Sequence, residues 1–183
     1  MNNKTDLSAF DNSWYEPGNL LKRFIWYFKN LFLFKSAVPW PNALKILTLR
    51  FFGAKVGKGV VIKPGVNIKY PWFLEIGDNV WIGEEVWIDN LGKVKIANNV
   101  CISQGAMLLC GSHNYKKNTF DLIIKDINLD EGVWVGAKAI VCPGVTMLSH
   151  SILTSGSVLT KDADSCTIYQ GNPAVPIKKR TVD

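Results

Sequence analysis

Residues Ile76–Asn90 read "IGDNVWIGEEVWIDN", and isoleucine stands at every sixth position from the first of them. This spacing fits neither the period of about 3.6 residues of a helix nor the simple alternation of a half-buried strand. The same period continues outward in both directions and predicts a β-helix built of hexapeptides. The residues in phase are Val56, Ile62, Ile68, Ile76, Ile82, Ile88, Ile96, Ile102, Leu108, Leu129, Val135, Val141, Met147, Leu153 and Leu159.

These hexapeptides are expected to stack as triangular coils, three to a coil. Two-residue insertions at Leu74 and Glu75 and at Val94 and Lys95 make similar segments return twenty residues further along the chain. The aliphatic residues then fill the interior of each coil, which becomes buried only when the next coil stacks on it. The sequence therefore predicts an all-β domain over residues 56–164. Glycines suit tight corners between the faces, and the candidates are Gly57, Gly77, Gly83 and Gly136.

Composition and charge set broader limits. The chain has 183 residues, of which 48% are hydrophobic, and this composition indicates one folded domain rather than a disordered chain. A net charge of +6 favours anionic partners without choosing among them. The four cysteines form no CxxC pair or metal-binding cluster, and we find no signal peptide. We therefore expect reduced thiols in a cytoplasmic protein.

Residues 1–55 precede the repeats and are expected to form a helical N-terminal cap segment. Within them Leu20–Phe34, "LLKRFIWYFKNLFLF", is rich in aromatic residues and predicts an amphipathic helix too short to span a membrane. Such a helix either covers the open end of the first coil or lies on a membrane surface with its basic residues toward the headgroups. We favour the cap, with weak and reversible membrane contact. At the other end, residues 165–183 are expected to form a C-terminal tail.

A histidine stands where the hexapeptide pattern stops, in "CGSHNY", Cys110–Tyr115. Counting hexads places His113 at the last position of its coil, and residues 114–128 form an inserted loop outside the repeat. A loop of this length in a regular solenoid is usually functional, so we expect it to project from the coil and cover a cleft. The residues alone leave His113 open between a turn histidine bonded to the backbone and a catalytic base.

The ordered hexads resemble those of the hexapeptide-repeat acyltransferases. "DNSWYEPG", "LKRFIWY", "VNIKYPWFLEIGDNVWIGEEVWIDNL", "GVWVGAKAIVCPGVT" and "QGNPA" extend the similarity to the colanic acid biosynthesis acetyltransferases over nearly the whole chain. The resemblance implies a left-handed parallel β-helix assembled as a homotrimer. It also implies direct acetyl transfer from the co-substrate acetyl-CoA to a sugar hydroxyl in exopolysaccharide or cell-surface glycan biosynthesis. Neither a metal nor a nucleic acid is expected, and a position at the inner face of the membrane is allowed.

The resemblance also implies site residues. His113 matches the family's catalytic base, and Asp89 and Asn90 in "WIDN" occupy the region of its polar active-site residues. Asp89 either orients His113 or binds the acceptor, or else it is a polar corner residue. Trp134, Gly136, Ser155, Thr160 and Lys161 match positions along the coenzyme A groove. Three basic residues follow near the C-terminus, Lys178, Lys179 and Arg180. We expect them either to bind the adenosine phosphate or to form a solvated tail.

Other functions and another mechanism are possible for a chain with this repeat. A zinc enzyme on this fold would collect three histidines, and this chain has two, His113 and His150, which argues against it. A covalent mechanism would use Cys110, three residues before His113, although a free cysteine is more often a small core residue. The chain could also acylate another small hydroxyl or amine acceptor, or serve as a scaffold without catalysis.

Overall fold

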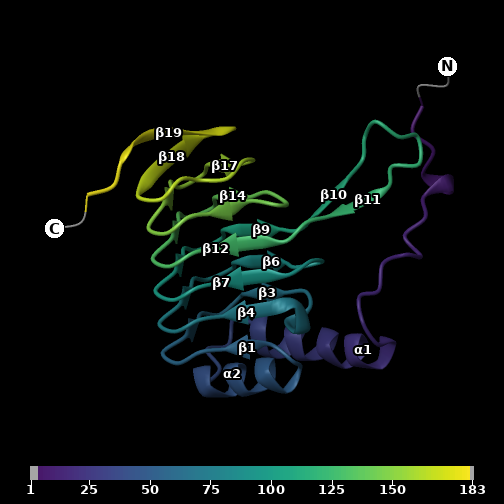
Figure 1. Cartoon of the computed structure of the whole chain (residues 1–183). Helices are drawn as coiled ribbons and strands as arrows, with labels where there is room; N and C mark the ends of the chain where they lie inside the picture. The colour runs from purple at the N-terminus through teal and green to yellow at the C-terminus, as the bar shows by residue number, and fades with distance from the viewer. Residues whose placement is uncertain (1–3, 182–183) are drawn as a thin grey trace.

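The computed structural model describes residues 4–181, so the outermost residues of the expected cap segment and tail, 1–3 and 182–183, lie outside it. Figure 1 shows stacked β-coils rising from two helices, with a hairpin projecting to one side. The strands form three parallel faces, and partners lie about one coil apart, as in Ile76 with Ile96 and Ile88 with Leu108. The predicted hexapeptide solenoid is confirmed.

Each face collects one strand from successive coils. The first contains β1 (Lys55–Val56), β4 (Leu74–Ile76), β7 (Val94–Ile96), β12 (Ile127–Leu129) and β15 (Thr146–Met147). The second contains β2 (Val61–Ile62), β5 (Trp81–Ile82), β8 (Cys101–Ile102), β13 (Trp134–Val135), β16 (Ile152–Leu153), β18 (Thr167–Gly171) and β19 (Ala174–Lys179). The third contains β3 (Asn67–Ile68), β6 (Trp87–Asp89), β9 (Met107–Leu109), β14 (Ile140–Val141) and β17 (Val158–Leu159).

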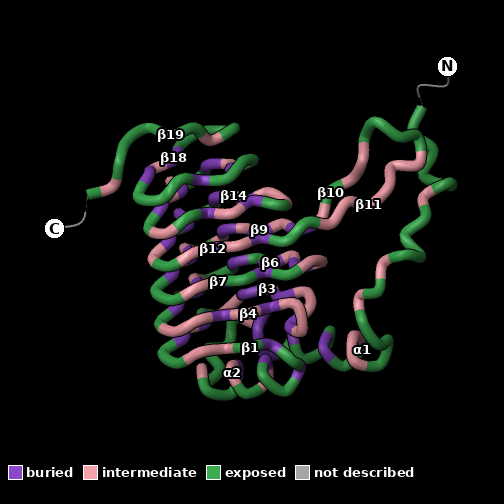
Figure 2. Tube along the Cα trace, viewed as in Figure 1, coloured by how far each residue is buried: buried purple, intermediate pink, exposed green. Residues whose placement is uncertain are grey.

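The core runs through the middle of the coils. Ile82, Ile88 and Leu108 are fully buried, and Figure 2 shows buried residues lining the solenoid while exposed ones lie outside and along the projecting segments. Full burial of one such side chain stabilises the fold by about 1.5–3 kcal/mol. The stacked interior is therefore the main source of stability.

The corner glycines serve a purpose different from the one expected. Gly57, Gly77, Gly83 and Gly136 lie at the corners, but none adopts the left-handed backbone. A Cβ at Gly136 would instead collide with the backbone of the next coil at Ser155. Close approach between coils therefore selects glycine here. Other residues adopt the left-handed backbone conformation, among them Asn79, Glu85, Asn99 and Lys138.

The N-terminal helices cover the first coil, as predicted (Figure 1). Trp26 is buried, and its indole N–H donates to the Ile68 carbonyl at 2.9 Å. Lys45 is also buried and donates to the Ile62 and Lys63 carbonyls, so the helices supply partners for the open edge of the coil. The helical segments are η1 (Leu7–Ala9), α1 (Leu20–Lys29), η2 (Asn30–Phe34), α2 (Asn42–Phe51) and, within the solenoid, η3 (Pro71–Phe73).

The predicted projecting loop forms a two-stranded arm. Strands β10 (Gly111–His113) and β11 (Leu122–Ile124) pair antiparallel, with His113 opposite Leu122. His113 therefore lies in the arm rather than in the coil, and the excursion begins two residues before it. We call residues 4–19 the strap, because they run from the arm to α1 (Figure 1), and the Asp6 N–H donates to the Asn118 carbonyl at 2.8 Å.

The C-terminal stretch, expected as a tail, forms a hairpin on top of the solenoid. Strand β18 pairs in parallel with β16, and β19 folds back antiparallel to β18. Tyr169 of β18 is buried and belongs to the hydrophobic core. The last described residues therefore cover the upper end of the core.

Candidate active site

The imidazole of His113 is held by both the arm and the strap. Its Nδ1 lies 2.9 Å from the Phe120 carbonyl oxygen. A carbonyl only accepts, so this bond places the proton on Nδ1 and leaves a lone pair on Nε2. The ring stacks on Phe120 at 4.4 Å between centroids, and the Phe10 ring of the strap lies 5.7 Å away. The backbone bond considered for a turn histidine is therefore present, and it is compatible with a base at Nε2.

His113 lines a cavity of about 570 Å³ between arm, strap and solenoid. Tyr15 closes one side, and its hydroxyl donates to the Leu91 carbonyl at 2.7 Å. Burial raises the pKa of Tyr15, which keeps this hydroxyl neutral and able to donate. The strap is thus fastened to the coil beside His113. The remaining lining residues are Phe10, Asn12, Ser13, Pro17, Arg23, Lys69, Tyr70 and Leu122.

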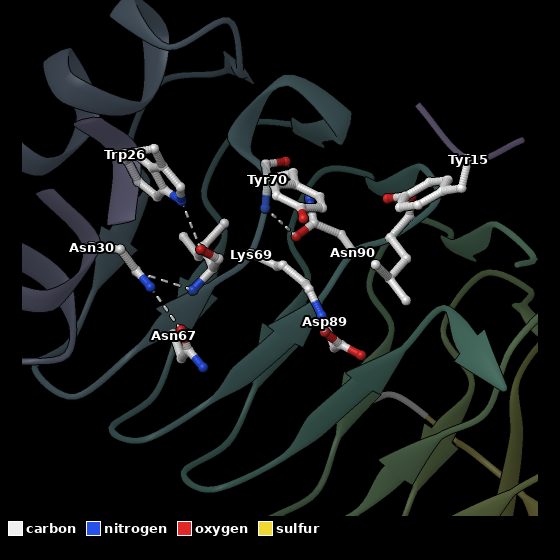
Figure 3. Close-up of polar contacts among 10 residues, drawn as sticks. Tyr15, Trp26, Asn30, Asn67, Lys69, Tyr70, Asp89 and Asn90 are labelled. Atoms are coloured by element: carbon white, nitrogen blue, oxygen red, sulfur yellow. Dashed lines mark hydrogen bonds and ion pairs between the residues drawn. The ribbon is translucent and has the colours of Figure 1, made fainter. Parts of the chain in front are cut away.

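Asp89 lies on the wall of a neighbouring cavity of about 470 Å³. Lys69 Nζ lies 3.0 Å from Asp89 Oδ1 as an ion pair (Figure 3). The approach falls outside hydrogen-bond geometry, so this buried oxygen lacks a donor among residues 4–181. Asp89 and His113 share no hydrogen bond or ion pair within residues 4–181 either. Both nevertheless flank the root of the arm, since a Cβ on Gly111 would lie 4.0 Å from Asp89 Oδ2.

Asn90 is fully buried and bonded to the backbone of the preceding coil. Its Oδ1 accepts from the Tyr70 N–H at 3.0 Å, and its Nδ2 donates to the Tyr70 carbonyl (Figure 3). The carboxamide of Asn90 thus stabilises the irregular turn that precedes η3. Of the two polar residues in "WIDN", Asp89 is the one with a side chain at a cavity wall.

The expected coenzyme A residues lie apart from both cavities. Trp134 is 44% exposed and its indole N–H donates to Ser103 Oγ at 2.9 Å. Lys179 Nζ donates to Thr167 Oγ1 at 2.8 Å, and the Arg180 guanidinium donates to the Gly132 and His150 carbonyls. These two basic residues are thus fastened to the solenoid. The exposed members of the set are Trp134, Ser155, Thr160, Lys161, Lys178 and Lys179, whereas Gly136 is buried.

Cys110 does not have the environment of a nucleophile. Its side chain is fully buried, and burial raises the pKa of the thiol to about 12. Because the thiolate is the reactive form, a thiol with this pKa is unreactive near neutral pH. This observation counts against the covalent route. Among residues 4–181 there is no group of three or more His, Cys, Asp or Glu side chains placed to hold a metal ion.

Several residues at this site carried no sequence signal. Phe120 lies seven residues after His113, in a segment without a repeat. Phe10 and Arg23 come from the segment preceding the repeats and reach the cavity only through folding of the strap and α1. The matching stretches "DNSWYEPG" and "LKRFIWY" contain Tyr15 and Arg23, and were the one hint that this segment contributes to the site.

The coils, the cap and the projecting arm together have the fold of the hexapeptide-repeat acetyltransferases. A protein of that description from Vibrio cholerae matches the fold with a TM-score of 0.80 at 20% identity, over 88% of this chain and 92% of its own. Its structure complexed with acetyl coenzyme A matches with a TM-score of 0.78 at 19% identity, over 88% of both chains. The left-handed β-helix predicted from the resemblance is confirmed by this match.

Sequence relatives narrow the assignment. WcaF of Escherichia coli, described as a colanic acid biosynthesis acetyltransferase, is 34% identical over 96% of this chain and 97% of its own. Galactoside O-acetyltransferase of Escherichia coli is 28% identical over 69% of this chain and 64% of its own. No protein-family model matches the chain. The chain belongs to the hexapeptide-repeat acetyltransferase family, and its interpretation as an acyltransferase is confirmed at that level.

Proposed function

We propose that the protein transfers an acetyl group from acetyl-CoA directly to a sugar hydroxyl during cell-surface glycan biosynthesis, with His113 as general base. The observation that carries this proposal is the bond from His113 Nδ1 to the Phe120 carbonyl, which leaves a lone pair on Nε2 in a residue that lines a ligand-sized cavity. The relative named for colanic acid biosynthesis, the galactoside O-acetyltransferase and the acetyl coenzyme A complex support the same donor and acceptor classes.

The proposed reaction begins with the acceptor hydroxyl within hydrogen-bond reach of His113 Nε2. Nε2 takes the hydroxyl proton as the oxygen attacks the thioester carbonyl carbon of acetyl-CoA. The tetrahedral oxyanion needs donors already aimed at it, for which backbone N–H groups at the coil edge are suited. When the carbon–sulfur bond breaks, the imidazolium returns the proton to the thiolate, giving the acetyl ester and free CoA.

Coenzyme A is proposed to lie along the coils rather than in either cavity. Its pantetheine arm would pass the exposed Trp134, whereas the buried Gly136 would contribute by letting the coils under the groove stack closely. Ser155, Thr160 and Lys161 are exposed further along the solenoid. Of the basic residues, Lys178 is exposed for the adenosine phosphate. Lys179 and Arg180 would have to exchange their present hydrogen bonds to join it.

A homotrimer is part of the proposal, with each cleft between neighbouring chains. The arm projects away from its own solenoid (Figure 1), and Tyr115 near its tip is 79% exposed. An arm in this position can cover a neighbouring chain's coils more readily than its own. Sedimentation analysis should give a species of three chains, and a fully active monomer would contradict the assembly.

Weak and reversible membrane contact is also proposed, at the cytoplasmic side where lipid-linked glycans are made. Helix α1 exposes Leu21 and Phe28, which line neither cavity, at 65% and 42%, although Trp26 is buried. The sequence between Pro17 and Leu74 contains lysines and arginines but no acidic residue, which favours an anionic surface. No helix among residues 4–181 is long and apolar enough to cross a bilayer.

Flotation with vesicles of anionic or zwitterionic lipid tests this contact. We expect partial binding to anionic vesicles that disappears at high salt. Leu21→Ser should weaken it, whereas Tyr115→Ser, a change of an exposed side chain on the arm, should not. Equal binding to both lipids, or none to either, would remove the membrane from the proposal.

The activity itself is tested with purified protein, acetyl-CoA and a panel of sugars. We expect CoA release that depends on an acceptor and a product whose acetyl group is removed by mild alkali, as an ester is. An alkali-stable product would indicate an amine acceptor instead. If no acceptor in a broad panel of sugars and glycans gave an acetylated product by mass spectrometry, the scaffold interpretation would replace catalysis.

A further inference from the structure

The cavity of His113 and the cavity of Asp89 meet along a shared wall. Arg23, Lys69 and Tyr70 line both of them. Arg23 comes from α1, while Lys69 and Tyr70 follow β3, so the wall forms where the cap meets the solenoid. A ligand with its reacting hydroxyl at His113 can therefore extend past Arg23 into the second cavity.

The shared wall has an excess of positive charge. Asp89 is the one acidic side chain in either lining, and it pairs with Lys69. The guanidinium of Arg23 has no hydrogen bond or ion pair within residues 4–181, although its side chain is half-buried. Lys35 adds a further cation at the second cavity. An unpaired guanidinium in a cavity is suited to bidentate binding of a carboxylate or phosphate.

The second cavity is otherwise suited to a sugar. Phe24, Tyr27 and Trp87 provide aromatic walls, and Asp89 provides a carboxylate whose Oδ1 is paired with Lys69. Pockets for small molecules combine such apolar walls with a few placed polar groups. The Asp89 side chain is 15% exposed while its Oδ1 is buried, so its other carboxylate oxygen can accept a hydrogen bond from a ligand hydroxyl beside Lys69.

We propose that the acceptor is an anionic saccharide, with its carboxylate or phosphate bound by Arg23 between the two cavities. The sugar carrying the reacting hydroxyl lies at His113, and the adjoining part lies against the aromatic wall with a hydroxyl on Asp89. This inference rests on the proposed acetyl transfer and adds the charge class of its acceptor. Arg23 acts in binding, not in proton transfer.

Matched probes test the charge preference. p-Nitrophenyl β-D-glucuronide and p-nitrophenyl β-D-glucoside differ by a carboxylate, and glucose 6-phosphate and glucose differ by a phosphate. Binding is followed by saturation-transfer NMR and titration, and transfer by CoA release. We expect one anionic probe to bind about ten- to hundredfold more tightly than its neutral partner, the scale of a hydrogen-bonded charge. The preferred pair identifies carboxylate or phosphate as the group bound.

Substitution of Arg23 tests whether this residue causes the preference for anionic probes. Arg23→Gln should raise KM and Kd for the anionic probe to those of the neutral one with little change in kcat, and Arg23→Lys should restore part of the preference. Lys58→Gln removes an exposed charge outside both cavities and should leave it unchanged. Equal binding of charged and neutral probes, or equal effects of Arg23→Gln on both, would overturn the inference.

The binding measurement separates this inference from the proposed reaction. His113→Ala should still bind the anionic probe while transferring no acetyl group. If wild-type protein binds that probe through Arg23 and no variant transfers acetyl, the reaction fails and the anionic subsite stands. If transfer proceeds equally to neutral sugars, the reaction stands and the subsite is wrong.

Discussion

The solenoid and the arm that interrupts it differ in how their residues are buried. Ile82 and Ile88 in the coils are fully buried, and each pairs in register with the coils before and after it. In the arm, none of the residues of β10 and β11 is buried, and β10 carries His113. The residue proposed for the chemistry therefore lies in the less buried of the two regions.

This difference follows from the repeat itself. Each coil presents nearly the same surface as the next, so a regular solenoid offers many similar grooves and no unique site. The arm and the strap break that equivalence at one level of the stack and bring Phe10, Phe120 and His113 together. The coils provide a rigid frame, and the interruption provides the site.

The largest expected effect is on the stability of the coils. Ile88→Ala should lower the free energy of unfolding by about 2–5 kcal/mol, because it leaves a cavity in a closely packed interior. Chemical denaturation measures this loss, with exposed Lys95→Ala as control. A loss below about 0.5 kcal/mol, the range of surface substitutions, would show that the coils are not the source of stability.

The second effect should be confined to catalysis. His113→Ala should lower turnover about a hundredfold or more, the scale for loss of a general base, while leaving the unfolding transition nearly unchanged. CoA release by the folded protein measures it. His150→Asn, which changes the other histidine at an exposed corner, should stay close to wild type. Near-normal turnover of His113→Ala would end its assignment as the base.

A smaller effect is expected where the strap meets the arm. Phe10→Ala removes the ring that lies 5.7 Å from the His113 ring, and such aromatic pairs contribute about 0.5–1.5 kcal/mol. Turnover should therefore fall about two- to tenfold. Leu7→Ala, an exposed strap residue, is the matched control. If both variants behaved alike, the strap would have no role in holding the imidazole.

The smallest effect should come from Cys110, which lies at the junction of coil and arm. Cys110→Ala should keep turnover within about twofold of wild type, because burial raises the pKa of its thiol to about 12 and no thiolate is present near neutral pH. Mass spectrometry after brief iodoacetamide treatment should find the exposed Cys166 modified before Cys110. An acetylated Cys110 during turnover would contradict direct transfer.

The sequence by itself determined the solenoid and marked the place of its interruption. A six-residue period places Ile82 and Ile88 inside the coils independently of the loop conformations, because these side chains become buried only when the coils stack. The same counting located His113 at the break. It also expected Gly136 at a tight corner but not the reason for glycine there, since the close approach of the next coil is not visible in a single strand.

The tertiary structure alone decided what surrounds His113. Phe10, Arg23 and Phe120 obey no repeat, and they meet because the strap crosses to the arm while α1 packs beneath the first coil. Contacts between segments so distant in sequence depend on how each one docks on the finished solenoid. The periodic interior can be predicted from short stretches of sequence. The environment of a single side chain, in contrast, depends on every segment that packs against it in the folded protein.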